Sequence, residues 1–149
     1  MGTRGFVVIK VNNKYYTYYN HYDSSSNRLG RELVDELKEI NYEEFKEMIK
    51  QLPTSTEKRD WADTVTLEGI IEDEMLYNEV EGAEDDPDDS DYNPIADLYM
   101  KNSIEYIWKI DLDRDEFEMY CFWNKFRMLG DLKDMEFTEK VFNMFARRR

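Results

Sequence analysis

The sequence predicts an α+β domain in which two β-hairpins form a four-stranded antiparallel sheet with helices on one face. Two runs of β-branched and aromatic residues near the N-terminus, two more after residue 103, and apolar positions at helical spacing elsewhere support this prediction. Of the 149 residues, 41% are hydrophobic and 15% are aromatic. This is enough apolar material for one packed core, so we expect a single domain over residues 1–149.

The first hairpin is predicted from Gly5–Val11 and Lys14–Asn20, which are separated by the pair Asn12-Asn13. Asparagine tolerates the positive φ angles that a two-residue hairpin turn requires. Such a turn fixes the pairing register, so Val7 is expected opposite Tyr18.

Three helices are predicted between the hairpins. The first ends at Asn41, which together with Glu44 also caps the second, and Pro53 closes that second helix. A third helix is expected over Trp61–Val80. The apolar positions that predict the first two helices are Leu33, Val34, Leu37 and Ile40, followed by Phe45, Met48, Ile49 and Leu52.

The second hairpin is predicted from Ile104–Leu112 and Asp115–Trp123, with a turn at Asp113-Arg114. One face of it is apolar and should pack on the core, whereas the other is mainly polar and should meet water. That polar face comprises Glu105, Lys109, Asp111, Glu116, Glu118 and Tyr120. A last helix is expected from about Glu136, with Phe137, Val141 and Phe145 as its apolar face.

The charge of the chain is concentrated in one segment. The formal net charge is −14, and no basic residue occurs between Arg59 and Lys101. Eight acids fall in the thirteen residues 79–91, interrupted by Gly82 and Pro87, which predicts a mobile acidic loop over about 79–94. This loop is either a solvated linker, a docking surface for a basic protein partner, or a mimic of nucleic-acid charge. The residues expected to bind a partner are Glu81, Glu84, Asp85, Asp86, Asp88, Asp89 and Asp91.

Several other classes of protein are disfavoured. A lone Cys121, the absence of a glycosylation sequon and an N-terminus unlike a signal peptide predict an intracellular protein, cytoplasmic or nuclear. No apolar run approaches the ~18 residues of a membrane span, and direct nucleic-acid binding is not expected without clustered basic residues. We expect no cofactor and no metal, because Asp111-x-Asp113-x-Asp115 lacks the glycine and glutamate of a calcium loop. Exposed sheet edges permit dimerisation without requiring it.

A polar cluster is predicted at the open end of the first hairpin. The register places Arg4 opposite His21, with Asn20 beside them and Asp23 on the same face. These residues form a candidate ligand site. An alternative is a hydrolase or transferase in which His21 is the general base, Asp23 orients it and Arg4 holds an anion. In a structural alternative, Arg4 pairs with Asp23 and the others hydrogen-bond the following loop.

Two segments carry a resemblance to a known family. The chain resembles a family of small, mostly fungal proteins of unknown function in its opening Gly2-Thr3-Arg4-Gly5 with Tyr19-Asn20-His21, and in the later Ile110-Asp111-Leu112-Asp113. Some phage proteins share the opening pattern of this family. The resemblance implies no activity, because none is established for that family. Where the family typically has a tyrosine and a proline, this chain has Ser25-Ser26, which implies an altered loop. We therefore expect a binding or interaction module rather than an enzyme.

Overall fold

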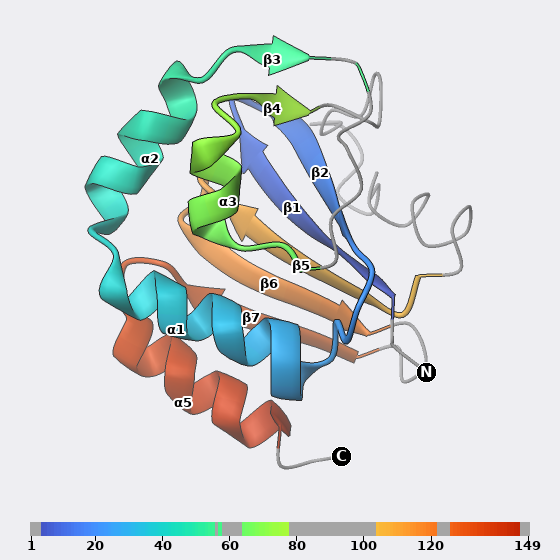
Figure 1. The fold of residues 1–149 in the computed structure, drawn as a ribbon. Helices are drawn as coiled ribbons and strands as arrows, with labels where there is room; N and C mark the ends of the chain where they lie inside the picture. The colour runs from blue at the N-terminus through green and yellow to red at the C-terminus, as the bar shows by residue number, and fades with distance from the viewer. Residues whose placement is uncertain (1–3, 56, 58–63, 78–103, 122–125, 147–149) are drawn as a thin grey trace, which may run out of the picture.

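The structure is a computed structural model that describes residues 4–55, 57, 64–77, 104–121 and 126–146. Figure 1 shows its ribbon. The predicted acidic loop, with all its candidate partner-binding residues, lies outside the described residues. No helix in the described ranges is long and apolar enough to cross a membrane.

The main sheet has five strands in the order β2-β1-β5-β6-β7, and it is mixed rather than antiparallel. β1 and β5 run parallel at its centre, and β7 adds a strand that the sequence did not predict. The four-stranded antiparallel prediction is therefore wrong in detail, although the α+β class is confirmed. The segment between β2 and β5 acts as the long crossover that parallel neighbours need. The strands are β1 (Gly5–Val11), β2 (Lys14–Asn20), β5 (Tyr106–Asp111), β6 (Glu116–Cys121) and β7 (Phe126–Asp131), with a small parallel pair of β3 (Thr54–Ser55) and β4 (Leu76–Tyr77).

Both predicted hairpin registers are confirmed. Val7 faces Tyr18, and Asn12 and Asn13 have φ angles of 53° and 62°. In the second hairpin Trp108 faces Met119, as expected, but the turn is four residues long. The Asp111 carboxylate forms this wider turn by accepting two backbone N–H groups within it, both at 3.0 Å.

The helices are α1 (Arg31–Glu39), preceded by the π-helical turn η1 (Ser26–Gly30), then α2 (Tyr42–Gln51), α3 (Leu67–Glu72) and α5 (Met135–Ala146). The cap at Asn41 is confirmed, since its Oδ1 accepts the Glu44 amide at 3.1 Å. The helix predicted over 61–80 is shorter than expected. Thr66 caps its start, the positive φ of Glu74 follows its end, and the chain then enters β4.

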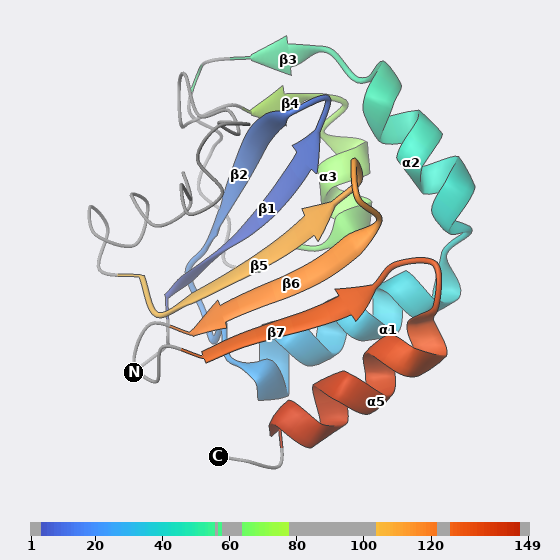
Figure 2. The ribbon, with the colours of Figure 1, turned by 180° about the vertical axis from the view of Figure 1, so that it is seen from behind.

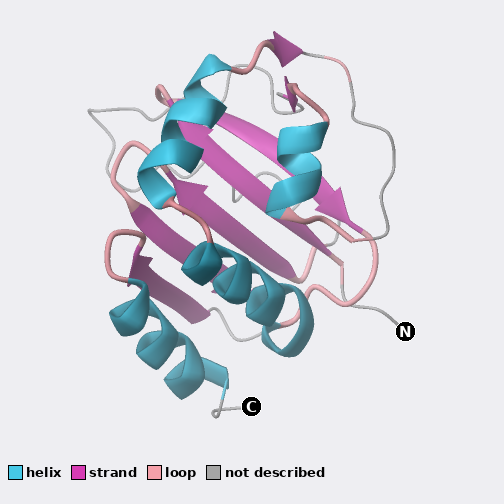
Figure 3. Cartoon of the chain, turned by 60° about the vertical axis from the view of Figure 1, so that its left-hand side comes forward, coloured by secondary structure: helices cyan, strands magenta, loops and turns pink. Residues whose placement is uncertain are grey.

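The four α-helices cover one face of the sheet, and Figures 1 and 3 show them layered against it. Trp108 of β5 lies at the centre of this layer and is fully buried. Its indole N–H donates to the Ser24 carbonyl at 2.8 Å. A Cβ at Gly30 would lie 2.4 Å from the indole ring, so only glycine lets the start of α1 approach so closely.

Helix α5 differs from the prediction at Phe137 only, since Phe145 is buried and Val141 packs against the core as expected. Its buried face consists of Thr138, Phe142 and Phe145, whereas the side chain of Phe137 is 49% exposed. Thr138 explains this difference, because its hydroxyl bonds the end of β7 and so fixes which side of the helix faces the sheet. Met48 of α2 is likewise 44% exposed instead of joining its predicted apolar face.

The opposite face of the sheet, toward the viewer in Figure 2, was expected to be solvated at the second hairpin, and this is wrong. Lys109, Asp111 and Glu118 are buried there. Lys109 pairs with Glu118 at 2.9 Å, and Lys10 lies 3.7 Å from Asp111. A buried charge needs a partner, and cross-strand register supplies one for each lysine.

Candidate functional site

The predicted polar cluster lies at one end of the first hairpin, and Asn20 is its buried member. Its side-chain amide donates to the Tyr22 carbonyl and to the Ser24 hydroxyl, each at 2.9 Å. The side-chain oxygen of Asn20, Oδ1, accepts a hydrogen bond from the Val65 backbone N–H at 2.8 Å. Asn20 therefore ties the hairpin both to the loop that follows it and to the segment before α3.

The other three cluster residues also make local contacts. The Nδ1 atom of His21 lies 3.0 Å from the Tyr19 hydroxyl, and Asp23 accepts the Ser25 amide at 3.0 Å. Arg4 is exposed, and its backbone carbonyl accepts a hydrogen bond from the Tyr106 N–H at 3.3 Å. These contacts organise the chain between β2 and η1. Ligand binding at this cluster, and acid–base catalysis by His21, stay predictions.

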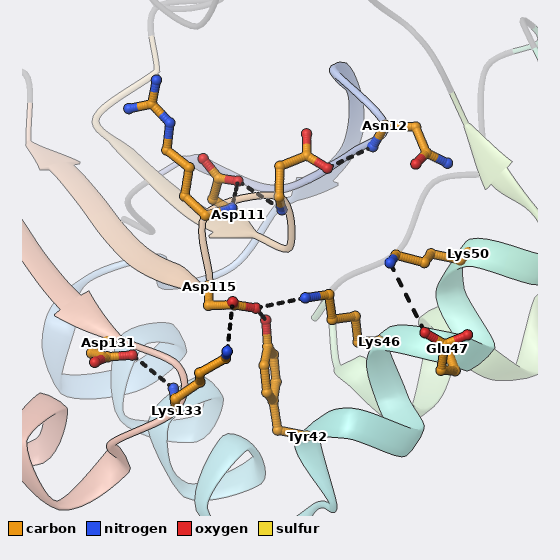
Figure 4. A network of polar contacts seen from close by, with 11 residues as sticks. Asn12, Tyr42, Lys46, Glu47, Lys50, Asp111, Asp115, Asp131 and Lys133 are labelled. Atoms are coloured by element: carbon orange, nitrogen blue, oxygen red, sulfur yellow. Dashed lines mark hydrogen bonds and ion pairs between the residues drawn. The ribbon is translucent and has the colours of Figure 1, made fainter.

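A second polar network lies at the opposite end of the sheet, where β1 and β5 end. Figure 4 shows Asp115, in the β5–β6 turn, at the centre of three donors. The Tyr42 hydroxyl donates to Oδ1, Lys46 Nζ approaches the same oxygen at 2.9 Å, and Lys133 Nζ lies 3.3 Å from Oδ2. One carboxylate thus joins α2 and the β7–α5 connection to this turn.

The ionisation of these groups follows from the contacts. Burial opposes the charge on Asp115, but hydrogen bonds from Tyr42, Lys46 and Lys133 outweigh it and lower the pKa of Asp115 to about 2. Burial, reinforced by the hydrogen bond to Asp115, raises the pKa of Tyr42 far above its ordinary value. The hydrogen bond to Asp115 also raises the pKa of Lys46. Asp115 is therefore ionised over the physiological range, and Tyr42 and Lys46 keep their protons.

The neighbouring aspartates serve turns. Asp113 accepts the backbone N–H groups of Asn12 and Asn13 at 2.8 and 2.9 Å, so its carboxylate holds the β1–β2 turn against the β5–β6 turn. Asp111 bonds its own turn. Within the described ranges, no group of three or more histidine, cysteine or acidic side chains is placed to hold a metal ion.

We expect Asp115→Asn to lower the free energy of unfolding by ~1–3 kcal/mol at pH 7, because hydrogen bonds to a charged group are lost. A folded-state pKa below the unfolded value means that this stabilisation is present above about pH 4 and disappears as the pH falls toward 2. Urea unfolding at a series of pH values measures it. Glu47→Gln, at an exposed carboxylate 3.9 Å from Lys50, is the control and should change stability little. A deficit for Asp115→Asn that is equally large at pH 2.5 would contradict the assignment.

Beside Asp115 lies an open cleft of about 510 Å³. It is formed by the β5–β6 turn with the start of β6, by β7, the last strand of the sheet, and by the start of α5 with the connection before it. Two of its apolar lining residues are largely exposed, Leu129 at 45% and Phe137 at 49%. The cleft is lined by Arg114, Asp115, Glu116, Leu129, Gly130, Asp131, Lys133 and Phe137.

The exposed side of α5 extends this apolar surface. One flank of the helix packs beside α1, since Arg31 contacts Glu139 at 2.9 Å and Asn143 at 3.1 Å. The opposite flank carries Phe137 and, two turns later, Met144, which is 60% exposed. Because α1 lies toward the middle of the sheet, this second flank lies on the side of the sheet edge.

Among the described residues, no strand lies along the outer edge of β7. The backbone N–H of Asp131 donates to the Thr138 hydroxyl at 2.8 Å, and that hydroxyl donates to the Asp131 carbonyl at 2.7 Å. The Leu132 N–H instead points inward and donates to the backbone carbonyl of Asp115. Backbone groups of successive residues in a strand point to opposite edges, so those of Leu129 point outward like those of Asp131. We call the outer edge of β7 at Leu129, together with Phe137 and Met144, the β7–α5 edge.

Sequence reasoning missed this edge for two reasons. It did not assign Phe126–Asp131 to a strand, and it placed Phe137 in the core. A usable signal was present in α5, where Phe137 and Met144 stand on one side and Phe142 and Phe145 on another. A helix that is apolar on two sides indicates two surfaces to bury.

Comparison of the chain with profiles of protein families, with curated proteins and with solved structures finds no match. The resemblance to the small fungal proteins therefore stays a prediction. The docking of the acidic segment on a basic partner also stays a prediction, since that segment lies outside the described residues.

Proposed function

We propose that the protein is an interaction module that binds a β-strand of a partner along β7. The observation that supports this proposal is the coincidence of an edge strand at Leu129 with a cleft lined by the exposed side chains of Leu129 and Phe137. Exposed edge strands pair readily with other chains, and folded proteins usually protect them with charges, proline or a covering element. Here Leu129 carries a largely exposed apolar side chain, and the Thr138 hydroxyl bonds only the backbone of Asp131 at the end of the strand.

The recognition would divide between backbone and side chains. The outward N–H and C=O of Leu129 would pair with an extended segment, which gives affinity for any strand. Apolar side chains of that segment would cover Leu129 and Phe137.

Peptide display on the immobilised chain tests the proposal. We expect selection of peptides with alternating apolar residues, as strand addition requires. Each selected peptide is then made synthetically and its affinity is measured for the wild type and for Leu129→Arg. The variant should bind at least ~10-fold more weakly, because a charge replaces the central apolar contact.

The matched control is Met48→Arg, which changes a comparably exposed apolar side chain on α2, outside the β7–α5 edge. It should bind the peptides like the wild type. Hydrogen exchange of the Leu129 amide should also slow when a peptide is bound. The proposal fails when no such peptide is selected, or when Leu129→Arg and Met48→Arg bind equally well.

A further inference from the structure

We propose that the β7–α5 edge binds a second copy of the same chain, with the two β7 strands antiparallel about a two-fold axis at Leu129. This inference rests on the proposed function, because it requires β7 to accept a strand. A second copy is the partner that fits all the exposed groups of the β7–α5 edge. Two sheets of five strands would then join into one continuous sheet.

The surface asks for more than a strand. A bare peptide paired with β7 would cover Leu129 but leave the outer flank of α5 exposed. Phe137, Leu129 and Met144 account for three of the five large apolar side chains that are exposed among the described residues. A partner that covers all three must bring both a strand and a helix beside it, and a second copy brings both.

The geometry of the edge is self-complementary. α5 runs back beside β7, and Thr138 is level with Asp131 because the two residues are hydrogen-bonded. Leu129 precedes Asp131 by two residues, which is ~7 Å along the strand. The same distance along α5 corresponds to four or five residues after Thr138. A two-fold axis at Leu129 therefore passes α5 between Phe137 and Met144. Met144 then faces the antiparallel helix of the other copy near Val141, and Phe137 faces the region of the C-terminal end of that helix.

The local charges permit this contact. The chain as a whole carries −14, which opposes association of two copies. Around the edge, however, Arg114, Lys133 and Lys140 are interspersed with Glu116, Asp131 and Glu136. The repulsion is therefore long-ranged and is screened by salt, so dimerisation should strengthen between low and physiological ionic strength.

The first test is the mass of the full chain by sedimentation or light scattering over a range of concentrations. We expect a concentration-dependent species of twice the 18.1 kDa chain mass. Met144→Glu and Phe137→Glu, both at exposed positions, should each raise the dissociation constant at least ~10-fold. The control Met48→Glu should leave it unchanged.

The second test fixes the register. An antiparallel hydrogen-bonded pair places its two Cα atoms ~5.5 Å apart, within the range that a disulfide spans. Leu129→Cys should therefore form a covalent dimer under mild oxidation, while Met48→Cys should not. The native Cys121 is buried and should stay reduced.

The outcomes separate this inference from the proposed function. A monomer at every concentration that still binds displayed peptides at Leu129 would overturn the second-copy inference and leave strand binding intact. A monomer that binds no peptide would overturn both. A dimer that Leu129→Cys does not cross-link, and that Met144→Glu does not weaken, would place the contact elsewhere and overturn the inference as well.

Discussion

Replacing Trp108 with alanine should lower the free energy of unfolding by ~3–5 kcal/mol, a large part of the total stability of a typical domain. The indole is fully buried among Tyr106, Phe117 and Phe142. Its removal would leave a cavity between the sheet and the helices and would also leave the Ser24 carbonyl without its indole donor.

Denaturant unfolding followed by circular dichroism measures this loss. Trp108→Phe retains a ring but not the N–H donor, so it should fall between the alanine variant and the wild type. Tyr22→Ala removes an exposed aromatic ring and is the matched control, with an expected change within ~0.5 kcal/mol. Equal midpoints for Trp108→Ala and Tyr22→Ala would show that the indole is not the centre of the core.

Lys109→Met should cost ~3–5 kcal/mol, because it leaves the carboxylate of Glu118 buried without its nearby ammonium group. The double variant Lys109→Met/Glu118→Leu should recover most of this loss, since a buried ion pair is often replaced by apolar side chains at little net cost. Thermal and denaturant unfolding of the single and double variants measure the coupling between the two sites.

An exposed pair provides the control for that cycle. Lys50 and Glu47 lie 3.9 Å apart on α2, and Lys50→Met should change stability by less than ~1 kcal/mol. The interpretation of the buried pair is wrong when the double variant is no more stable than Lys109→Met alone. In that case the cost would come from the shape of the lysine side chain rather than from the loss of the ammonium group beside Glu118.

The hairpins could be predicted from sequence because their determinants are local. A turn such as Asn12-Asn13 fixes the pairing of every residue beside it, and alternation then assigns the faces. The pairing of β1 with β5 has no such determinant, because no turn connects two parallel strands. The rotation of α5 depends on the hydrogen bonds between Thr138 and Asp131, which spacing of apolar residues does not encode.

The candidate site likewise has a part that local sequence predicts and a part that depends on tertiary structure. Arg4, Asn20, His21 and Asp23 lie at or just beyond the end of the first hairpin; the pairing ends at Gly5 and Asn20, so the placement of Arg4 opposite His21 stays a prediction. The hydrogen bonds of Asn20 to the following loop were expected in the structural alternative, whereas its bond to Val65 depends on tertiary packing and was not predicted. The β7–α5 edge depends on which strand is outermost, and strand order is a property of the whole chain.

The parallel pairing of β1 with β5 also bears on how the chain reaches its native state. Gly5 pairs with Tyr106. During synthesis, β1 therefore stays without this neighbour until β5 has been made, about a hundred residues later. Pairings so distant in sequence slow folding, because the loop entropy is lost before the contacts form. Until β5 arrives, the nascent hairpin has an unpaired apolar edge, so during synthesis this region is the one most exposed to aggregation and most in need of a chaperone.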